Sequence, residues 1–178
     1  ETIPARLWTS TLARARETAQ FIPHASITGP GGKSWKQMRD RIDRNLDELS
    51  AGSCDGRTIQ DIRERDPQIL EDWGRDKFGF RFPKGESYYD VIWRVDDLCT
   101  YLESFAEPLL IISHRRVLRL IISWLTELSR KESLKFTAFD RLLQHSVVKI
   151  SFDGLEDPSI TVYPLGPVGV MNSVAVDS

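Results

Sequence analysis

Hydrophobic residues follow two different spacings along this chain of 178 residues. The run Leu109–Ile112 is apolar throughout, which predicts a strand buried on both faces. After it, residues 117–125 repeat apolar side chains at helical spacing. A buried strand that leads into such a helix is typical of a parallel sheet covered by helices. This pattern predicts an α/β fold.

The N-terminal part is expected to begin with a strand at 5–9, followed by a helix that Ser10 caps and Pro23 ends. Apolar residues at helical spacing predict the buried stripe of that helix: Leu12, Ala15, Ala19, Phe21 and Ile22. Residues 34–44 are polar and predict no definite element.

Two segments have the spacing of a capping box, in which a Ser or Thr and an acidic residue three positions later cap a helix start. Thr58–Asp61 predicts a helix that ends near Pro67, and Ser87–Asp90 predicts a longer helix to about Phe105. Cys99 lies on the apolar face of that longer helix and is expected to be a core thiol.

The C-terminal part predicts a connection at 134–143 and two strands at 147–152 and 160–163. A turn that begins at Asp153-Gly154 joins the two strands, and the second is expected at a sheet edge. Residues 166–178 have no clear pattern.

These elements predict one α/β domain over residues 1–165, with a tail at 166–178. Its expected architecture has three layers, with a largely parallel sheet and helices on both faces. The chain begins with Glu1 and enters a strand almost at once, so we expect it to be cut from a longer protein.

Composition narrows the possible partners. The chain has 24 Lys and Arg and 26 Asp and Glu, so its net charge is -2 and no broad basic surface favours nucleic acid or an anionic membrane. No apolar run approaches the roughly 20 residues that span a bilayer. Two cysteines are too few for a disulfide framework or a zinc site. We expect a cytoplasmic protein.

His114 is the first candidate for chemistry. It follows the strand 109–112, at the carboxyl edge where open α/β sheets bind ligands. Arg115, Arg116 and Arg119 come directly after it, and cations beside a helix start favour an anion such as phosphate. The alternative is that His114 is an ordinary polar residue at a strand end.

Three further clusters carry candidate groups. Ser10 and Arg14 stand at the first strand-to-helix junction, where a guanidinium can face an anion. Glu48 lies between two leucines in a short strand or turn, and partial burial of a carboxyl suits a general acid. Residues 76–88 offer several cations and the phenol of Tyr88 for a second anionic group. Taken singly, each of these groups also fits an ordinary solvated surface.

Together, four segments resemble the histidine phosphatase (phosphoglycerate mutase-like) superfamily, over residues 6 to 152. They are Trp8-Thr9-Ser10 with Arg14 and Thr18-Ala19, Leu46-Asp47-Glu48-Leu49 with Ala51-Gly52 and Cys54, Arg81–Tyr88, and Leu110–His114. The run Pro83–Tyr88 is similar to the fructose-2,6-bisphosphatase domains of 6-phosphofructo-2-kinase/fructose-2,6-bisphosphatase, and the other segments point to the superfamily only.

The resemblance implies hydrolysis of a phosphate monoester through a phosphohistidine. Arg14 matches an arginine that clamps the phosphate, Glu48 matches the general acid, and His114 matches a second histidine that binds the phosphate. No metal or other cofactor is implied, because guanidinium and imidazolium groups supply the positive charge.

For the sugar and its other phosphate, the resemblance implies binding by Lys77, Tyr88 and Arg119. Three positions depart from the bisphosphatases: Ile59 replaces a tyrosine, Trp73 replaces an arginine, and Arg115 replaces a glutamine. Arg75 lies near enough in sequence to take over from the lost arginine, and Arg115 brings a charge of its own.

The nucleophilic histidine of the family lies in an Arg-His-Gly motif on its first strand, and this motif does not occur in the 178 residues. His24 and His145 stand in other contexts. We expect an upstream segment to supply the motif, and the resemblance also implies a kinase domain further upstream and a possible homodimer. The alternatives are a broader sugar-phosphate phosphatase and a catalytically silent domain that binds sugar phosphates for regulation.

Overall fold

The computed structural model describes residues 5–22, 26–28, 34–36, 38–104, 107–129, 132–133, 146–152, 158–164 and 174–175. The chain divides into two compact units, Glu1–Val117 and Leu118–Ser178. The helices and longer strands of the first unit are β1 (Ala5–Thr9), α1 (Ala13–Ala19), β4 (Met38–Ile42), α2 (Ile59–Arg65), α3 (Pro67–Arg75), α4 (Tyr88–Glu103) and β5 (Leu109–Ile112). It also contains the short antiparallel pair β2 (Ser26–Thr28) and β3 (Ser34–Lys36), and the 3-10 turns η2 (Arg44–Leu46) and η3 (Gly52–Cys54).

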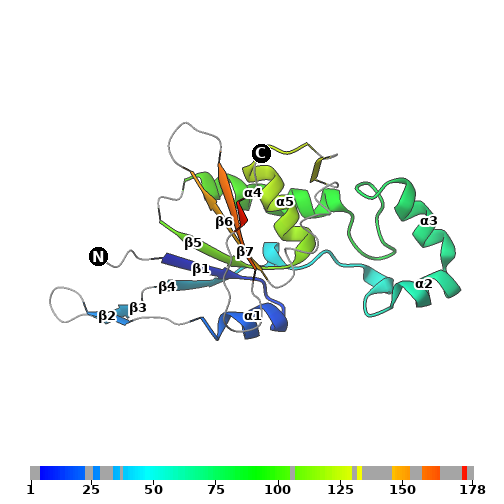
Figure 1. The fold of residues 1–178 in the computed structure, drawn as a ribbon. Helices are drawn as coiled ribbons and strands as arrows, with labels where there is room; N and C mark the ends of the chain where they lie inside the picture. The colour runs from blue at the N-terminus through cyan, green and yellow to red at the C-terminus, as the bar shows by residue number, and fades with distance from the viewer. Residues whose placement is uncertain are drawn as a thin grey trace. The chain divides into compact units, whose positions relative to one another are not determined.

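A parallel sheet of order β4-β1-β5 forms the centre of the first unit (Figure 1). Thr9, the last residue of β1, lies opposite Ile42 of β4 and Ile112 of β5. The carboxyl ends of all three strands therefore meet at one edge of the sheet.

Helices cover both faces of this sheet. Because successive strand residues point to opposite sides, neighbouring residues of β1 contact different helices. Leu7 and Thr9 face α1, whereas the ring of Trp8 stacks on Tyr101 of α4 with centroids 5.8 Å apart and planes inclined by 4°. Leu7 and Trp8 are each 1% exposed, so the strand is buried on both sides. The expected three-layer α/β architecture is confirmed.

Both predicted capping boxes are present. The Thr58 side chain accepts from the backbone of Asp61 at the start of α2, and Ser87 does the same with Asp90 at the start of α4. Cys99 is fully buried on the apolar face of α4, as expected of a core thiol.

The first helix differs from its prediction. It begins at Ala13 with Leu12 as the N-cap, and the Ser10 hydroxyl is instead held between groups from the other two strand ends. The helix ends before Phe21, which is 81% exposed rather than part of a buried stripe.

Three other features of the first unit were not anticipated. β4 forms from a stretch that gave no clear pattern. Its charged residues hide the apolar spacing of a strand, but they suit the edge of a sheet. α3 begins at Pro67, since proline is favoured at the first position of a helix and need not mark the end of one. All four residues of β5 are half-buried rather than buried on both faces, and among the described residues β5 pairs with β1 alone.

The second unit includes most of α5 (Arg115–Leu125) and an antiparallel sheet of order β6-β7-β8. β6 (Ser146–Ser151) and β7 (Ser159–Pro164) confirm the two predicted strands, but β7 is central rather than at an edge, because β8 (Val174–Ala175) pairs with it. β8 falls within the segment expected to be a tail. The predicted turn at Asp153-Gly154 and the connection at 134–143 lie outside the described residues.

None of the helices in the described part of the chain is both long and apolar enough to cross a membrane.

Candidate functional site

The candidate site lies at the carboxyl edge of the β4-β1-β5 sheet. After β1 the chain passes to α1 on one face, and after β4 it leads to α4 on the other face. Ligands of open α/β sheets bind where neighbouring strands send their connections to opposite faces. Ser10 N donates to Ile112 O and Asp43 N donates to Thr9 O, so the segments that leave the three strands start side by side.

His114 is the centre of this edge. Its side chain is buried, with 7% of the residue exposed. The Nε–H of Arg14 donates to Nδ1 of His114 over 3.2 Å, and Nε2 of His114 lies 2.8 Å from Ser10 Oγ. An Nδ1 that accepts a hydrogen bond carries no proton, so the imidazole is neutral and Nε2–H donates to Ser10.

Ser10 passes this chain of hydrogen bonds to Asp47. The Ser10 hydroxyl donates to Asp47 Oδ1 over 2.8 Å, and the same carboxylate accepts from Thr11 N and Thr11 Oγ1 over 2.7 and 2.6 Å. Burial raises the pKa of Asp47, but the bonds from Thr11 and Ser10 and the charge of Arg94 outweigh it and hold that pKa below its usual value. Asp47 therefore stays ionised and ties the β1 end to the Glu48 loop.

The pKa of His114 is lowered from 6.5 to about 4. The largest cause is burial, which disfavours the imidazolium, and the Arg14 guanidinium adds repulsion. Asp47 acts in the opposite direction but does not reverse the shift. His114 is therefore neutral at neutral pH, in agreement with its hydrogen bonds.

Glu48 stands on a tightly folded loop after β4. Asp43 caps η2 by accepting from Asn45 N, and Leu46 and Leu49 are buried on either side of the glutamate. Glu48 itself is half-buried, and its Oε1 accepts from Leu49 N over 2.9 Å. The short strand or turn expected around Glu48 is not present: Glu48 lies in the loop that follows η2.

The Pro83–Glu86 run packs its backbone directly on the loop after Glu48. Ser53 N donates to Pro83 O, and Glu86 N donates to Ser50 O. A side chain on Gly85 would place its Cβ 2.5 Å from Ser50 O, so only glycine permits this approach.

Of the residues expected to bind the sugar and its second phosphate, Arg75 ends α3, Lys77 lies in the loop that follows, and Tyr88 opens α4. Lys77 is exposed, with Nζ 5.6 Å from the centre of the Trp73 ring. Arg75 pairs with Asp72 on its own helix at 3.2 Å. Tyr88 is buried against Phe78, with ring centroids 5.0 Å apart.

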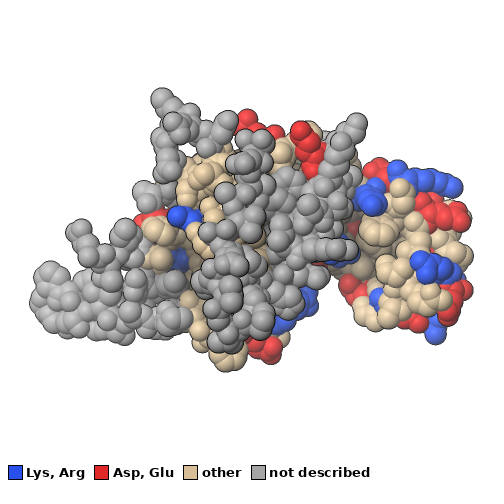
Figure 2. Space-filling view, viewed as in Figure 1, with Lys and Arg blue, Asp and Glu red and all other residues tan. Residues whose placement is uncertain are grey.

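Figure 2 shows acidic and basic side chains interspersed over α2 and α3, so the charge of Arg75 is partly neutralised there. Arg115 is exposed and opens α5 directly after His114. Arg119 is buried one turn further along α5, in the second unit. The structure thus brings together Arg14, His114 and the loop that bears Glu48.

Sequence patterns missed several members of this network. The Ser10 hydroxyl was expected to cap a helix, and Asp47, Glu86 and Arg94 drew no functional interpretation. Glu86 directly precedes the Ser87 N-cap and Arg94 lies about two turns into α4, so in sequence the two resemble ordinary solvated charges at a helix start.

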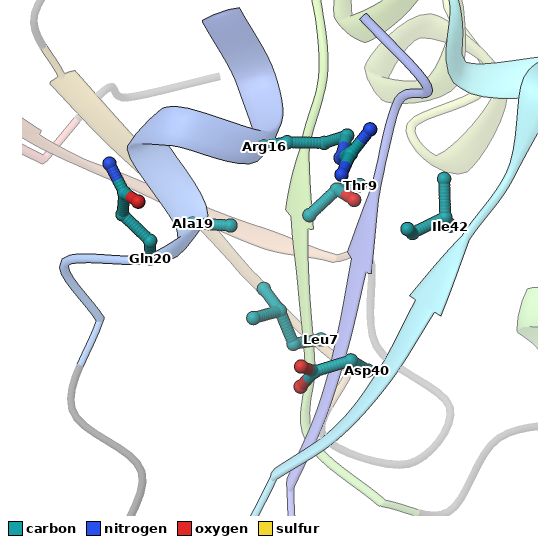
Figure 3. A pocket seen from close by; sticks show the side chains of 7 residues that line it. All are labelled: Leu7, Thr9, Arg16, Ala19, Gln20, Asp40 and Ile42. Carbon is teal, nitrogen blue, oxygen red and sulfur yellow. The ribbon is translucent and has the colours of Figure 1, made fainter. Parts of the chain in front are cut away.

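A separate pocket lies between α1 and the sheet, and Figure 3 shows its side chains. It is lined by Leu7, Thr9, Arg16, Ala19, Gln20, Asp40 and Ile42. None of the expected site residues lines it, so it does not contain the candidate chemistry.

Comparison with known proteins identifies the family to which the chain belongs. A sequence profile of the histidine phosphatase superfamily (branch 1) matches residues 1–160. The chain belongs to this superfamily. The resemblance carried by its four sequence segments is confirmed.

Among curated relatives of this histidine phosphatase chain, a 6-phosphofructo-2-kinase/fructose-2,6-bisphosphatase from Arabidopsis thaliana is 38% identical over 72% of the chain and 16% of that protein. A fructose-2,6-bisphosphatase from Saccharomyces cerevisiae is 36% identical over 71% of the chain and 25% of that protein. The chain therefore spans a quarter or less of either relative.

Solved structures share the fold. The protein YhfR from Bacillus stearothermophilus matches with a TM-score of 0.59 and 20% identity, over 97% of this chain and 73% of that one. An alpha-ribazole phosphatase from Shigella flexneri matches with a TM-score of 0.58 and 24% identity, over 73% and 60%. At these identities the likeness concerns the α/β architecture alone.

Proposed function

We propose that this chain is a phosphatase domain that removes the 2-phosphate of fructose 2,6-bisphosphate and releases fructose 6-phosphate and phosphate. The observation that carries the proposal is the Arg14–His114 pair at the carboxyl edge of the sheet, tied through Ser10 and Asp47 to the loop of Glu48. Membership of the superfamily and the names of the relatives agree with it.

In the proposed reaction, a histidine nitrogen attacks phosphorus, the bond between phosphorus and the sugar oxygen breaks, and the Glu48 carboxyl gives its proton to that oxygen. Water then attacks the phosphohistidine, gives a proton to the Glu48 carboxylate and releases phosphate. Arg14 uses Nε for His114, and its guanidinium has four further N–H donors for phosphoryl oxygens.

The nucleophile of this scheme is a histidine in an Arg-His-Gly segment outside the 178 residues. We place its strand beside β5, whose four apolar residues are half-buried and which, in the described part of the chain, pairs only with β1. A parallel strand at that edge would end beside His114.

The other expected site residues complete the substrate pocket in this proposal. Lys77, Tyr88, Arg75, Arg115 and Arg119 bind the sugar and its 6-phosphate, and no metal or cofactor takes part. The parent chain of this proposal carries a kinase domain upstream, in line with the names of its relatives, and works in the cytoplasm as a homodimer in the control of glycolysis.

A phosphoenzyme trap tests the proposal in the parent chain. The protein is mixed with fructose 2,6-bisphosphate labelled at the 2-phosphate, quenched in alkali, and examined for acid-labile label on the protein. Label on the protein supports the mechanism. If the sugar bisphosphate binds and no label is transferred, the proposal fails in favour of a catalytically silent binding domain.

One observation favours a second candidate, a broader sugar-phosphate phosphatase. Ile59 is 52% exposed and Trp73 engages Lys77, at two positions where a polar contact to a sugar phosphate was expected from the resemblance. Comparable turnover of several sugar phosphates would support this broader activity.

A further inference from the structure

One arginine of α4, Arg94, binds two backbone carbonyls of the loop that carries Glu48. Arg94 donates from Nη1 to the carbonyl oxygen of Asn45 and from Nη2 to that of Asp47. Its side chain is 18% exposed, so both bonds are shielded from water. One guanidinium thus fixes the backbone directly before Glu48.

Glu86 fixes the backbone on the other side of Glu48. Its Oε2 accepts from Ser50 N over 2.9 Å, and its own N–H donates to Ser50 O over 2.8 Å. Arg94 Nε donates to Glu86 Oε1 over 3.0 Å, so the two anchors are joined to each other.

The remaining carbonyl of this stretch is also bound. Ser113, the neighbour of His114, donates from Oγ to Leu46 O over 2.6 Å. Consecutive carbonyls at 45, 46 and 47 therefore all accept from side chains distant in sequence, and Leu46 is fully buried. The position of this stretch is therefore set by side chains from α4 and from the segment after β5.

We propose that Arg94 and Glu86 are positioning residues for Glu48: they clamp the backbone on both sides of the general acid and hold its carboxyl where the departing oxygen will lie. The proposal rests on the proposed function, in which Glu48 supplies that proton. Its physical basis is that displacement of a reacting group by about 1 Å can lower a rate by about 100-fold.

The fork geometry of Arg94 makes Arg94→Lys the informative change. Lysine keeps the positive charge but cannot reach two carbonyls and a carboxylate at once. Arg6→Lys is the matched control, because Arg6 also forms a half-buried pair, with Glu107 at 2.7 Å, and lies at the start of β1. Both variants are made in the parent chain, and thermal unfolding verifies that each is folded.

The readout is turnover of two substrates that differ in their need for an acid. Fructose 2,6-bisphosphate releases an alkoxide that must be protonated, whereas p-nitrophenyl phosphate releases a stable phenolate. We expect Arg94→Lys to lower kcat for the sugar bisphosphate by about 10- to 100-fold and to change turnover of the aryl phosphate by less than about threefold. Arg6→Lys should change neither. In a Glu48→Gln background, Arg94→Lys should have no further effect.

Equal losses on both substrates, or an effect that adds fully to Glu48→Gln, would overturn the positioning role. An unaltered parent chain that turns over neither substrate would refute the proposed function instead. In that case hydrogen exchange in the parent chain decides the structural part. Faster exchange of the Leu49 and Ser50 amides in Arg94→Lys than in Arg6→Lys supports the clamp, and equal exchange rejects it.

Discussion

Arg14 donates its Nε–H to Nδ1 of His114 across 3.2 Å, and an imidazole that accepts this bond must be neutral. Protonation of His114 would place two cations in contact inside a buried site. Burial and the charge of Arg14 therefore disfavour protonation of His114 in the native state and lower its pKa to about 4.

Stability should consequently fall as pH drops from 6.5 to 4. In this window the unfolded chain binds a proton at His114 that the folded chain does not, so the free energy of unfolding increases with pH. Above pH 6.5 His114 is neutral in both states, and the free energy of unfolding no longer depends on it. A fall of the pKa from 6.5 to about 4 corresponds to at most about 3–4 kcal/mol. Urea unfolding of the 178-residue chain at half-unit steps of pH measures it.

The matching control is His114→Gln, in which the slope between pH 4 and 6.5 should disappear. Asp47 and Asp90 have lowered pKa values, so their contributions are lost only at lower pH and do not produce this slope. A slope that persists in His114→Gln would assign it to other groups.

Removal of the Ser10 hydroxyl should destabilise the fold. In Ser10→Ala the buried Nε2–H of His114 loses its acceptor and Asp47 loses a donor, which predicts a loss of about 1–3 kcal/mol in the free energy of unfolding. Ser53→Ala is the control, because its exposed hydroxyl contacts only a loop carbonyl and should matter by less than about 0.5 kcal/mol. Similar values for the two variants would contradict the role of the buried chain.

Local sequence signals predicted the elements with strong, self-contained patterns. β1, α4 and β5 have apolar runs or a capping box with a periodic face, and each was placed within a few residues of its observed bounds. Arg14, Glu48 and His114 were selected because motifs within single segments carry them.

Features that depend on contacts between segments could not be predicted in the same way. β4 has three consecutive charged residues and becomes a strand only because β1 pairs with it. Ser10 resembled a helix cap until Asp47, 37 residues away, was seen to hold its hydroxyl. The half-burial of β5 depends on its neighbours in the sheet, about which its own apolar run says nothing.

The proposed acid role of Glu48 predicts a separation of turnover from binding. Glu48→Gln keeps the size of the side chain and removes the proton that the departing oxygen needs. We expect kcat for fructose 2,6-bisphosphate in the parent chain to fall by about 100-fold or more, with substrate affinity changed by less than about threefold. Parallel losses of affinity and turnover would refute the acid role.

The close packing of Gly85 predicts a large effect from one methyl group. In Gly85→Ala the new Cβ would lie 2.5 Å from Ser50 O and 2.7 Å from Gly52 N, and backbone atoms cannot move aside cheaply. We expect a loss of about 1–3 kcal/mol in the free energy of unfolding. In Gly74→Ala, a change within α3 where nothing lies within 4 Å, the same methyl should stabilise by about 0.5–1 kcal/mol. Changes of the same sign would show that the packing of Gly85 is unimportant.

Trp73 and Ile59 should determine how well the second phosphate is recognised. Trp73→Arg with Ile59→Tyr releases Lys77 from the indole ring and restores two polar groups at the positions where bisphosphatases carry them. A charged hydrogen bond gained in the complex predicts about a tenfold rise in kcat/KM for fructose 2,6-bisphosphate relative to p-nitrophenyl phosphate in the parent chain.

Trp93→Arg is the matched control for this change, because it adds the same charge at a 79% exposed tryptophan of α4. It should leave the ratio of the two kcat/KM values unchanged, since solvent screens a charge at so exposed a position. If both variants shift the ratio equally, overall charge rather than a local contact controls selectivity. If neither does, Trp73 and Ile59 lie outside the pocket for the second phosphate, and the broader phosphatase activity becomes the better description of this domain.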